Sequence, residues 1–592
     1  MKHGVAFSDH IKTEKIRRHK ISDVTFGSMR GYLLGFFLMS FLLILFTRLA
    51  YLQFVKGSYY RDLSDANRTR TKVVHAPRGV IFDRHGKPLV YNLPGFREKK
   101  GEKSIVITRD EALAKMAKGS EAIEIDSLRQ YPYKESLAHI LGYIGQVSKD
   151  DLKDAELSGY EATDWLGKEG IEMMYEKRLR GENGKQLIEV DALGGEVRQL
   201  GQTDPVSGQD ITLTIDLHVQ EATYKAMQGV KRGAAVVTTP RGEVLAMVSK
   251  PSFDPNLFTL GTSYRPKEGY QSLDSIFADN VGQPLLNRAI SGTYPPGSTF
   301  KLITAAAGLE NNLIDAGYRV ADTGVLRVGA FSFANWFFTQ YGRTDGDVNV
   351  VKAIARSNDI FFYKLAELVR VDRLSAMAKK FGVGSRTGLD LTGEAAGILP
   401  TAEWKKKAIG ESWYLGDTYH YGIGQGYVLA TPLQVNSWTE AIANGGTLQK
   451  PRLLQSAKST GQSEAFLSEK TISLIRQGMI DSCSTGGVAW PLFNFKVKNA
   501  KLPIDGKDII EAPQATTSAD FKDYRQITVA CKTGTAQHGG EETKPHAWIT
   551  LFAPAYNPQI VVTVLSEESG EGSSVAGPIA KKILEAYFSN LR

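Results

Sequence analysis

The chain has 592 residues, of which 42% are hydrophobic and 23% are charged, with 58 glycines and 22 prolines. This composition is typical of a folded, turn-rich protein of several domains and excludes a collagen-like or largely disordered chain. The net charge is +8, but about half of that excess lies in residues 1–30 and the remainder is nearly balanced, which argues against nucleic acid as a partner.

An uncharged segment, GYLLGFFLMSFLLILFT, runs from Gly31 to Thr47 and is followed by Arg48 and the apolar LAYLQFV. A helix needs about 20 apolar residues to cross a bilayer, so we expect one transmembrane anchor over residues 31–53. A cleaved signal peptide is the alternative, although its apolar region is usually shorter. The basic flank precedes the anchor, so the positive-inside rule predicts residues 1–30 in the cytoplasm and the remaining chain outside it.

Residues 54–208 mix short strand and helix patterns, and we expect them to form a first domain outside the membrane. Within it, HAPRGVIFDRHGKPLVYN, from His75 to Asn92, predicts a hairpin that turns at residues 84–88.

A second, larger domain is expected over residues 209–592. It opens with a strand and an amphipathic helix at Asp210–Met227, followed by a hairpin that turns at Pro240-Arg241-Gly242. Helical stretches follow, and the chain ends in three apolar strands and a closing helix. Strands at both ends with helices between them predict an α+β fold, with one antiparallel sheet and a helical cluster.

Cys483 and Cys531 are the two cysteines of the chain, and they allow at most one disulfide. Their spacing is not that of a metal site. We expect both to be buried, small apolar residues, with a disulfide as the less favoured alternative.

The first candidate for chemistry is the segment SGTYPPGSTFK, in which Ser298 stands three residues before Lys301. The prolines end the preceding segment and a helix begins near Lys301, so both side chains are expected on one helical face. A buried lysine that loses its proton can activate a serine as a nucleophile. The alternative is that Ser298 is an ordinary helix cap.

Two further motifs follow at a distance. Ser357-Asn358-Asp359 lies between two helical runs, where a second hydroxyl could relay a proton, or where the motif could simply cap the next helix. Lys532-Thr533-Gly534-Thr535 ends a strand, where a lysine and hydroxyls can bind a carboxylate and a glycine permits close approach. The alternative for this third motif is a strand that ends in a turn.

Together, S-x-x-K, the Ser357 motif and K-T-G resemble the set found in penicillin-binding proteins and β-lactamases. The chain resembles a class B penicillin-binding protein over nearly its whole length, and Asp359 followed by IFFYK is most like the elongation-type subfamily, penicillin-binding protein 2. The resemblance also covers YGIGQGYVLATPLQV, from Tyr421 to Val435, and HAWITLFAP. It implies an anchor, an elongated mixed α/β pedestal or dimerisation domain, and a transpeptidase domain with a five-stranded antiparallel sheet flanked by helices plus a helical subdomain.

The resemblance implies a peptidoglycan D,D-transpeptidase that cross-links stem peptides through a serine acyl-enzyme formed at D-Ala-D-Ala. Ser298, Lys301, Ser357, Asp359 and Lys532 would be catalytic, and Asn358, Thr533, Gly534 and Thr535 would bind substrate. The backbone N–H groups of Ser298 and Thr535 would form the oxyanion hole. No metal or cofactor is expected, and His420 and His538 are expected in packing or surface roles.

The same resemblance implies bacterial inner-membrane localisation and inhibition by β-lactams. It also implies partners: peptidoglycan stem peptides, a SEDS-type (RodA-like) glycosyltransferase, an elongation scaffold, and membrane lipid around residues 31–53. A division-type transpeptidase, a carboxypeptidase or β-lactamase-like hydrolase, and a non-enzymatic β-lactam sensor remain alternatives. Two departures are a short stretch between Gly86 and Tyr131 and an apparent insertion from Trp490 to Gln526.

Overall fold

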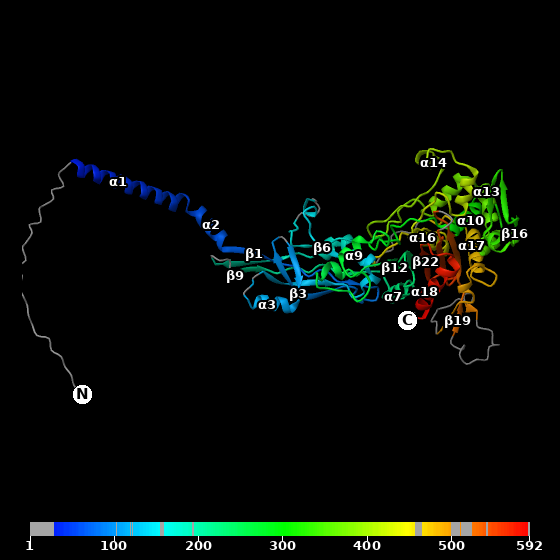
Figure 1. Cartoon of the computed structure of the whole chain (residues 1–592), viewed down its shortest axis with the longest axis horizontal. Helices are drawn as coiled ribbons and strands as arrows, with labels where there is room; N and C mark the ends of the chain where they lie inside the picture. The colour runs from blue at the N-terminus through cyan, green and yellow to red at the C-terminus, as the bar shows by residue number, and fades with distance from the viewer. Residues whose placement is uncertain are drawn as a thin grey trace, which may run out of the picture. The chain divides into compact units, whose positions relative to one another are not determined.

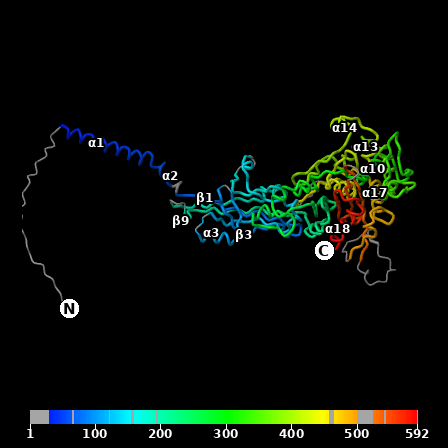
Figure 2. Tube along the Cα trace, viewed as in Figure 1, coloured from blue at the N-terminus to red at the C-terminus, as the bar shows by residue number. Residues whose placement is uncertain are grey.

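The structure is a computed structural model that describes residues 29–101, 103–118, 120, 122–153, 159–191, 195–455, 464–498, 509–510, 524–539 and 543–589 (Figures 1 and 2). The predicted cytoplasmic tail lies outside these residues except for its last two, as does much of the predicted insertion at 490–526. The chain divides into two compact units, Met1–Lys72 with Lys185–Thr203, and Val73–Gly184 with Asp204–Arg592.

The first unit contains the apolar helix that the sequence predicts. Helix α1 (Met29–Ala50) continues into the π-helical turn η1 (Tyr51–Val55), and together these 27 residues are long and apolar enough to cross a membrane. Their large apolar side chains are exposed, as contact with lipid requires. Helix α2 (Gly57–Arg68) follows. A three-stranded sheet in the order β1-β8-β9 combines β1 (Thr69–Val74), β8 (Gly184–Val190) and β9 (Glu196–Thr203).

The second unit begins with small sheets and short helices. The turn expected at residues 84–88 is confirmed, because Phe82 and Pro88 form an antiparallel bridge across it. The stretch between Gly86 and Tyr131 supplies a sheet in the order β4-β3-β5. The elements of this part are β2 (Ile81–Phe82), β3 (Tyr91–Lys100), β4 (Lys103–Ile107), α3 (Arg109–Met116), β5 (Ile123–Gln130), η2 (Lys134–Ser136), α4 (Ala138–Leu141), β6 (Ile144–Gln146), η3 (Asp151–Lys153), β7 (Trp165–Gly167), α5 (Gly170–Met174) and α6 (Glu176–Leu179).

A buried ionic cluster joins these small elements. Glu172 on α5 is fully buried, and it accepts hydrogen bonds from Arg129 at 2.7 Å and from Arg78 at 2.9 Å. A buried carboxylate is tolerated only when it is paired in this way, so the cluster fixes α5 against β5 and the segment before β2.

The larger part of the second unit is built on the predicted antiparallel sheet. Its strands lie in the order β12-β11-β22-β21-β20, and every neighbouring pair is antiparallel. The strands are β11 (Gly233–Thr238), β12 (Val244–Lys250), β20 (Ala530–Ala536), β21 (His546–Ala553) and β22 (Ile560–Ser566). The predicted strand at residues 524–537 is divided, since β19 (Tyr524–Ile527) pairs with β17 and β18 in a separate small sheet.

Helices cover both faces of this sheet (Figure 1). One apolar cluster joins α7 (Leu217–Ala226) and α18 (Gly577–Ser589) to residues such as Val237 and Ile549 on one face. The other joins α10 (Lys301–Glu310), α13 (Asp359–Lys380) and α16 (Pro432–Ala443) to residues such as Trp548 and Leu565 on the opposite face. Both faces of the sheet are therefore buried, which explains why its strands are almost continuously apolar.

The remaining elements connect the sheet and the helical cluster. They are β10 (Ile211–Thr212), α8 (Asn256–Thr259), α9 (Leu273–Ala278), η5 (Gly297–Phe300), β13 (Val320–Asp322), β14 (Val325–Val328), β15 (Phe331–Ala334), α11 (Trp336–Tyr341), β16 (Gly346–Val348), α12 (Val350–Arg356), α14 (Ala402–Ala408), α15 (Leu415–Gly422), α17 (Glu469–Ser482), η6 (Trp490–Leu492), β17 (Lys496–Lys498), β18 (Ile509–Ile510) and η8 (Gly572–Ala576).

One expectation about the cysteines is wrong. Cys483 and Cys531 are joined in a disulfide, with their Cα atoms 5.9 Å apart. Both are buried, as expected, but as a cross-link between the end of α17 and β20. The sequence could not favour this result because 48 positions separate the two residues, and only the fold brings them together.

Candidate active site

Ser298 lies in a tight turn at the entrance to a buried helix. The 3-10 turn η5 runs directly into α10, and a 3-10 turn has three residues per turn, so Ser298 and Lys301 lie on the same side of the backbone. Ser298 is half-buried and Lys301 is fully buried. The predicted helix start is confirmed. The alternative that Ser298 caps the helix is wrong, because Phe300 occupies the capping position and forms no side-chain cap.

Three segments far apart in the sequence meet at the hydroxyl of Ser357. Nζ of Lys301 donates to Oδ1 of Asp359 at 2.6 Å and to the carbonyl oxygen of Ser357 at 2.8 Å, and it lies 3.4 Å from Ser357 Oγ. Nζ of Lys532 donates to the same Oγ at 2.8 Å. The two amines and the hydroxyl therefore form a continuous polar row, along which a proton can be transferred.

Ser357 itself is held in an unusual backbone conformation. It ends helix α12 with φ of 54°, in the left-handed region that a residue with a side chain rarely adopts. Such a conformation costs about 1 to 3 kcal/mol and persists only where the surroundings enforce it. Here the hydrogen bonds to both lysines hold it, so the strain lies at the centre of the site.

The buried surroundings of Lys301 and Lys532 disfavour the protonated, charged form of both amines. Burial lowers the pKa of Lys301, and this effect exceeds the opposing one of the Asp359 carboxylate. Burial also holds the pKa of Lys532 well below its ordinary value, and the charge of Lys301 lowers it further. Since two ammonium groups beside one hydroxyl repel each other, the arrangement favours a neutral amine, which can accept a proton.

Two residues that the sequence reasoning missed hold Asp359 in place. The backbone N–H of Trp336 donates to Asp359 Oδ2 at 2.9 Å, and the side chain of Asn335 accepts from the backbone N–H of Asp359 at 3.1 Å. Both carboxylate oxygens of Asp359 are thereby bonded, one to Lys301 and one to Trp336. The segment FANWFF carries no motif spacing, so no sequence signal indicates this role.

Asn358 forms hydrogen bonds inside the protein that hold the Ser357 motif in place. Its side chain caps helix α13 by accepting from the backbone N–H of Phe361 at 2.9 Å, so the capping alternative for this motif is confirmed. Its amide nitrogen donates to Asp322 at 2.9 Å and to Asp345 at 3.1 Å. Asn358 is fully buried, and these internal bonds use both ends of its amide.

Strand β20 passes very close to the turn that carries Ser298. A Cβ atom on Gly534 would lie 3.0 Å from Trp548 Cβ and 3.1 Å from Thr299 Cγ2, so a larger residue would be crowded here. From the other side, a Cβ on Gly297 would lie 3.0 Å from the carbonyl oxygen of Thr535. The backbones of Ser298 and Thr535 are thus neighbours, as two donors to one oxyanion must be, and Thr535 is exposed at the site.

Residues Tyr421–Gly426 hold the turn that carries Ser298 through hydrogen bonds to its backbone and to α10. The backbone N–H of Gly297 donates to the carbonyl of Gly424 at 2.9 Å, and Thr304 on α10 donates to the carbonyl of Gly422 at 2.8 Å. Gly424 has φ of 75° and approaches so closely that a Cβ would lie 2.1 Å from the Gly297 carbonyl oxygen. Glycine is therefore required at position 424, and these contacts fix the position of the turn that carries Ser298.

The two histidines near the motifs make packing contacts. His538 bonds to Glu568 at 3.2 Å and stacks on His546, whereas His420 contacts the ring of Phe333. Among the residues that the structure describes, no group of three or more His, Cys, Asp or Glu side chains could hold a metal ion.

The sequence models of two known protein families match two separate segments of the chain. The sequence model of the penicillin-binding protein transpeptidase domain matches residues 233–585, and that of the penicillin-binding protein dimerisation domain matches residues 107–213. The chain is 33% identical to the peptidoglycan D,D-transpeptidase MrdA of Haemophilus influenzae, over 92% of this chain and 89% of that protein.

Two solved structures are similar along most of the chain. The penicillin-binding protein PBP2 of Helicobacter pylori, solved in complex with MreC, is 28% identical with a TM-score of 0.71, over 88% of this chain and 99% of that one. A structure described as the structural coordination of polymerization and crosslinking by a peptidoglycan synthase complex is 28% identical with a TM-score of 0.69, over 96% of this chain and 99% of that one. The chain therefore belongs to the penicillin-binding protein 2 family of peptidoglycan D,D-transpeptidases.

Proposed function

We propose that this chain cross-links peptidoglycan stem peptides during cell elongation, with Ser298 as its nucleophile. The observation that carries the proposal is the buried row Lys301, Ser357 and Lys532, one turn from Ser298. A neutral Lys301 takes the proton of Ser298, whose oxygen attacks the carbonyl between two terminal D-alanines. The backbone N–H groups of Ser298 and Thr535 stabilise the oxyanion, a contribution of about 3 kcal/mol for one donor in other acyl-transfer enzymes.

The proton then leaves through Ser357. The hydroxyl passes a proton to the departing D-alanine and is restored along the row of amines. An amine from a neighbouring stem peptide next attacks the acyl-enzyme, which forms the cross-link and frees Ser298. A β-lactam mimics the D-Ala-D-Ala amide, so it acylates Ser298 and blocks this second step.

Strand β20 would align the substrate. It is an edge strand of the sheet, and an extended peptide can pair with such an edge. The hydroxyls of Thr533 and Thr535 and the Lys532 amine would receive the terminal carboxylate, whose negative charge favours the protonated form of that amine, and Gly534 keeps the approach open. For Asn358 we now propose a positioning role in place of substrate contact, because its amide is bonded inside the protein.

The same proposal covers the location and partners of the chain. Helix α1 would anchor it in the inner membrane with residues 1–30 in the cytoplasm, 54–208 as the pedestal and 209–592 as the transpeptidase domain. The H. pylori relative was solved with MreC, and another relative in a complex that polymerises and cross-links. We propose that this pedestal contacts an elongation scaffold of that kind, and that a SEDS-type, RodA-like glycosyltransferase supplies the glycan chains.

Labelling with a fluorescent penicillin tests the nucleophile. The wild-type chain should form a stable adduct that is absent in Ser298→Ala. Lys301→Arg should also abolish it, because arginine keeps the charge but cannot give up its proton. Rapid turnover of the drug would instead indicate a hydrolase, and unchanged labelling of Lys301→Arg would exclude lysine as the base.

Depletion in cells tests the elongation role. Loss of rod shape or swelling is the expected result. Filamentation would contradict the proposal and favour a division-type transpeptidase, and normal growth and shape with unchanged cross-linking would favour a sensor.

A further inference from the structure

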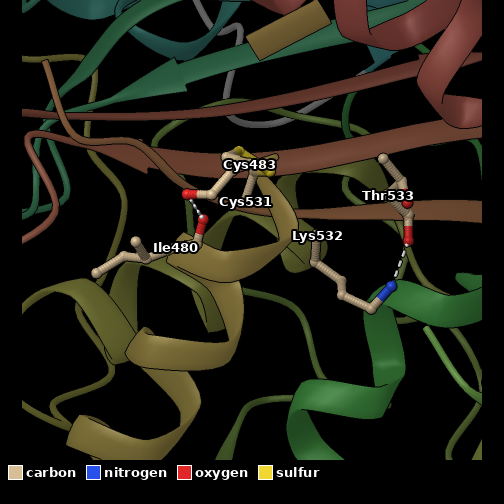
Figure 3. The surroundings of a disulfide bond; sticks show 6 residues. Ile480, Cys483, Cys531, Lys532 and Thr533 are labelled. Atoms are coloured by element: carbon tan, nitrogen blue, oxygen red, sulfur yellow. Dashed lines mark hydrogen bonds between the residues drawn. A yellow bond between two sulfur atoms is a disulfide. The ribbon is translucent and has the colours of Figure 1, made fainter. Parts of the chain in front are cut away.

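We infer that the disulfide between Cys483 and Cys531 is a positioning device for Lys532, and that the chain reaches full activity only after oxidation of these two thiols. This inference rests on the proposed function. Cys531 immediately precedes Lys532 on β20, and Figure 3 shows the disulfide beside the lysine, with Lys532 extending from the strand toward Thr533 O. Successive residues of a strand point to opposite faces, so the disulfide holds the strand from the face opposite the Lys532 side chain.

The packing of the two clusters supports this geometry. Cys483 and Cys531 belong to the apolar cluster of α7 and α18, whereas Ala530 and Ala536 belong to the cluster of α10, α13 and α16. Lys532 shares the face of Ala530 and Ala536. The cross-link therefore lies on the face opposite the Lys532 side chain and acts on that lysine through the position of the strand.

The disulfide also closes a ring of contacts around the site. Cys483 ends α17, and α17 packs on α12 so closely that a Cβ on Gly478 would lie 2.7 Å from Ile354 Cβ. The loop after Cys483 meets α12 again, because Arg356 donates to the carbonyl of Gly486 at 3.0 Å. Helix α12 ends at Ser357, whose Oγ receives the 2.8 Å bond from Lys532.

Without the cross-link, one edge of that ring depends on weaker interactions. Strand β20 is an edge strand, bonded along its length to β21 alone within the sheet. The chain enters it from the segment that contains β17, β18 and β19, a small separate sheet. Joining β20 to α17 makes the position of Lys532 independent of that segment.

Burial decides when the bond must form. Cys483 is 5% exposed and Cys531 is fully buried, so a reductant or oxidant cannot reach the sulfur atoms of the folded chain. The bond is therefore made during folding rather than switched later. Two thiols exchange with the disulfide of an oxidising thiol-disulfide oxidoreductase, which takes up two electrons and two protons and becomes a dithiol. Such oxidants act outside the cytoplasm, where the transpeptidase domain is proposed to lie.

The test compares the full-length wild-type chain with Cys483→Ala/Cys531→Ala, by the rate of fluorescent penicillin acylation from pH 6 to pH 10 and by melting temperature. We expect the double variant to acylate about 10-fold or more slowly. The acid limb of its pH–rate profile, over which the acylation rate rises with pH, should move to higher pH. Water that enters beside a displaced strand raises the pKa of the buried lysines. Leu584→Ala, a buried residue of α18, is the matched control. It should lose melting temperature without a change in the pH profile.

A second variant keeps the inference testable if the double variant does not fold. Gly478→Ala leaves the disulfide intact but pushes α17 from α12, so it should shift the pH profile in the same direction. The folded wild-type chain should keep its acylation rate after treatment with dithiothreitol. Alkylation of the wild-type chain followed by mass spectrometry should find no free thiol. An unchanged acylation rate and pH profile in the folded double variant would overturn the inference alone, as would free thiols in the native chain. If the double variant does not fold, an unchanged profile in Gly478→Ala would overturn it, whereas a wild-type chain without a Ser298 adduct would remove the proposed function as well.

Discussion

At the scale of single residues, the ion pair of Lys301 and Asp359 decides how the site reacts to pH. Burial lowers the pKa of the lysine, and the carboxylate 2.6 Å away opposes that effect. The carboxylate thus has two roles, since it holds the amine toward Ser357 and limits how far its pKa falls.

Asp359→Asn should separate these two roles. Removal of the negative charge lowers the pKa of Lys301 further, so more of the amine is neutral at low pH and the acid limb of acylation should move to lower pH. The maximal rate should fall about 10- to 100-fold, because the amine loses its strongest partner. Penicillin acylation rates measured across the pH range check both effects.

Asn335→Ala provides the comparison for that variant. It removes a side chain that orients Asp359 but leaves the charge in place, so the rate should fall while the acid limb stays where it is. An acid limb that moves equally in both variants would show that the charge of Asp359 is not what sets the pKa of Lys301.

The residues that we propose as catalytic could be predicted from the sequence, and those that hold them in place largely could not. Ser298, Lys301, Ser357 and Lys532 stand in short motifs whose residue types and order indicate their chemistry. Asn335 and Trp336 each form one hydrogen bond to Asp359, which lies in another helix and more than 20 positions further along the chain. Nothing in a linear pattern of aromatic residues distinguishes such a position from ordinary packing.

At the scale of elements, the site depends on how closely β20 approaches η5. Gly534 and Gly297 are the points of contact, and a Cβ atom on either would be crowded, at 3.0 Å from its nearest neighbour. The turn and the strand must keep this distance for the backbone N–H groups of Ser298 and Thr535 to face one oxyanion.

Gly534→Ala should therefore impair acylation without unfolding the domain. The added methyl group would press on Trp548 and Thr299, and β20 would move away from the turn, with an expected loss of about 10- to 100-fold in the acylation rate. Gly229→Ala, where a Cβ meets open space, is the matched control and should acylate as the wild type does. Equal rates in all three proteins would show that this close approach is not needed.

A second element carries an unusual buried acid. Glu440 on α16 is almost fully buried against the sheet, and burial raises its pKa to about 8. Its partner is Thr238 on β11, whose Oγ1 lies 3.4 Å from Glu440 Oε2. Because the unfolded chain loses this proton at a lower pH than the folded chain, the contribution of Glu440 to stability is greatest at acid pH and falls as the pH rises toward 8.

Glu440→Gln should remove that loss of stability. The variant keeps the shape of the side chain and a donor, so its melting temperature should fall less than that of the wild type between pH 5 and pH 9. The difference in unfolding free energy at the upper end should be on the order of 3 kcal/mol in favour of the variant. Parallel melting curves across this range would contradict the raised pKa.

Element types could be predicted better than element partners. The apolar runs and the Pro240-Arg241-Gly242 turn predicted β11, β12, β21 and β22, and the structure confirms them. The division of β19 from β20 depends on the pairing of β19 with β17 and β18, and the disulfide joins cysteines 48 positions apart, so no local pattern encodes either.

At the scale of the whole molecule, each unit has its own task. One unit contains a helix long and apolar enough to span a bilayer, and the other contains the site. The order of helix, small sheets and large sheet was predictable, because the change from one long apolar run to alternating patterns is visible in the sequence. The boundary at residues 208 and 209 stays a prediction.

The most direct test of the central claim uses the full-length chain in membranes with a polymerase partner and a lipid-linked precursor. We predict cross-linked stem-peptide dimers in the digested product, which disappear with Ser298→Ala or after penicillin treatment while the glycan chains still form. Products that only lose their terminal D-alanine would identify a carboxypeptidase, and unchanged dimers in Ser298→Ala would rule out Ser298 as the nucleophile of cross-linking.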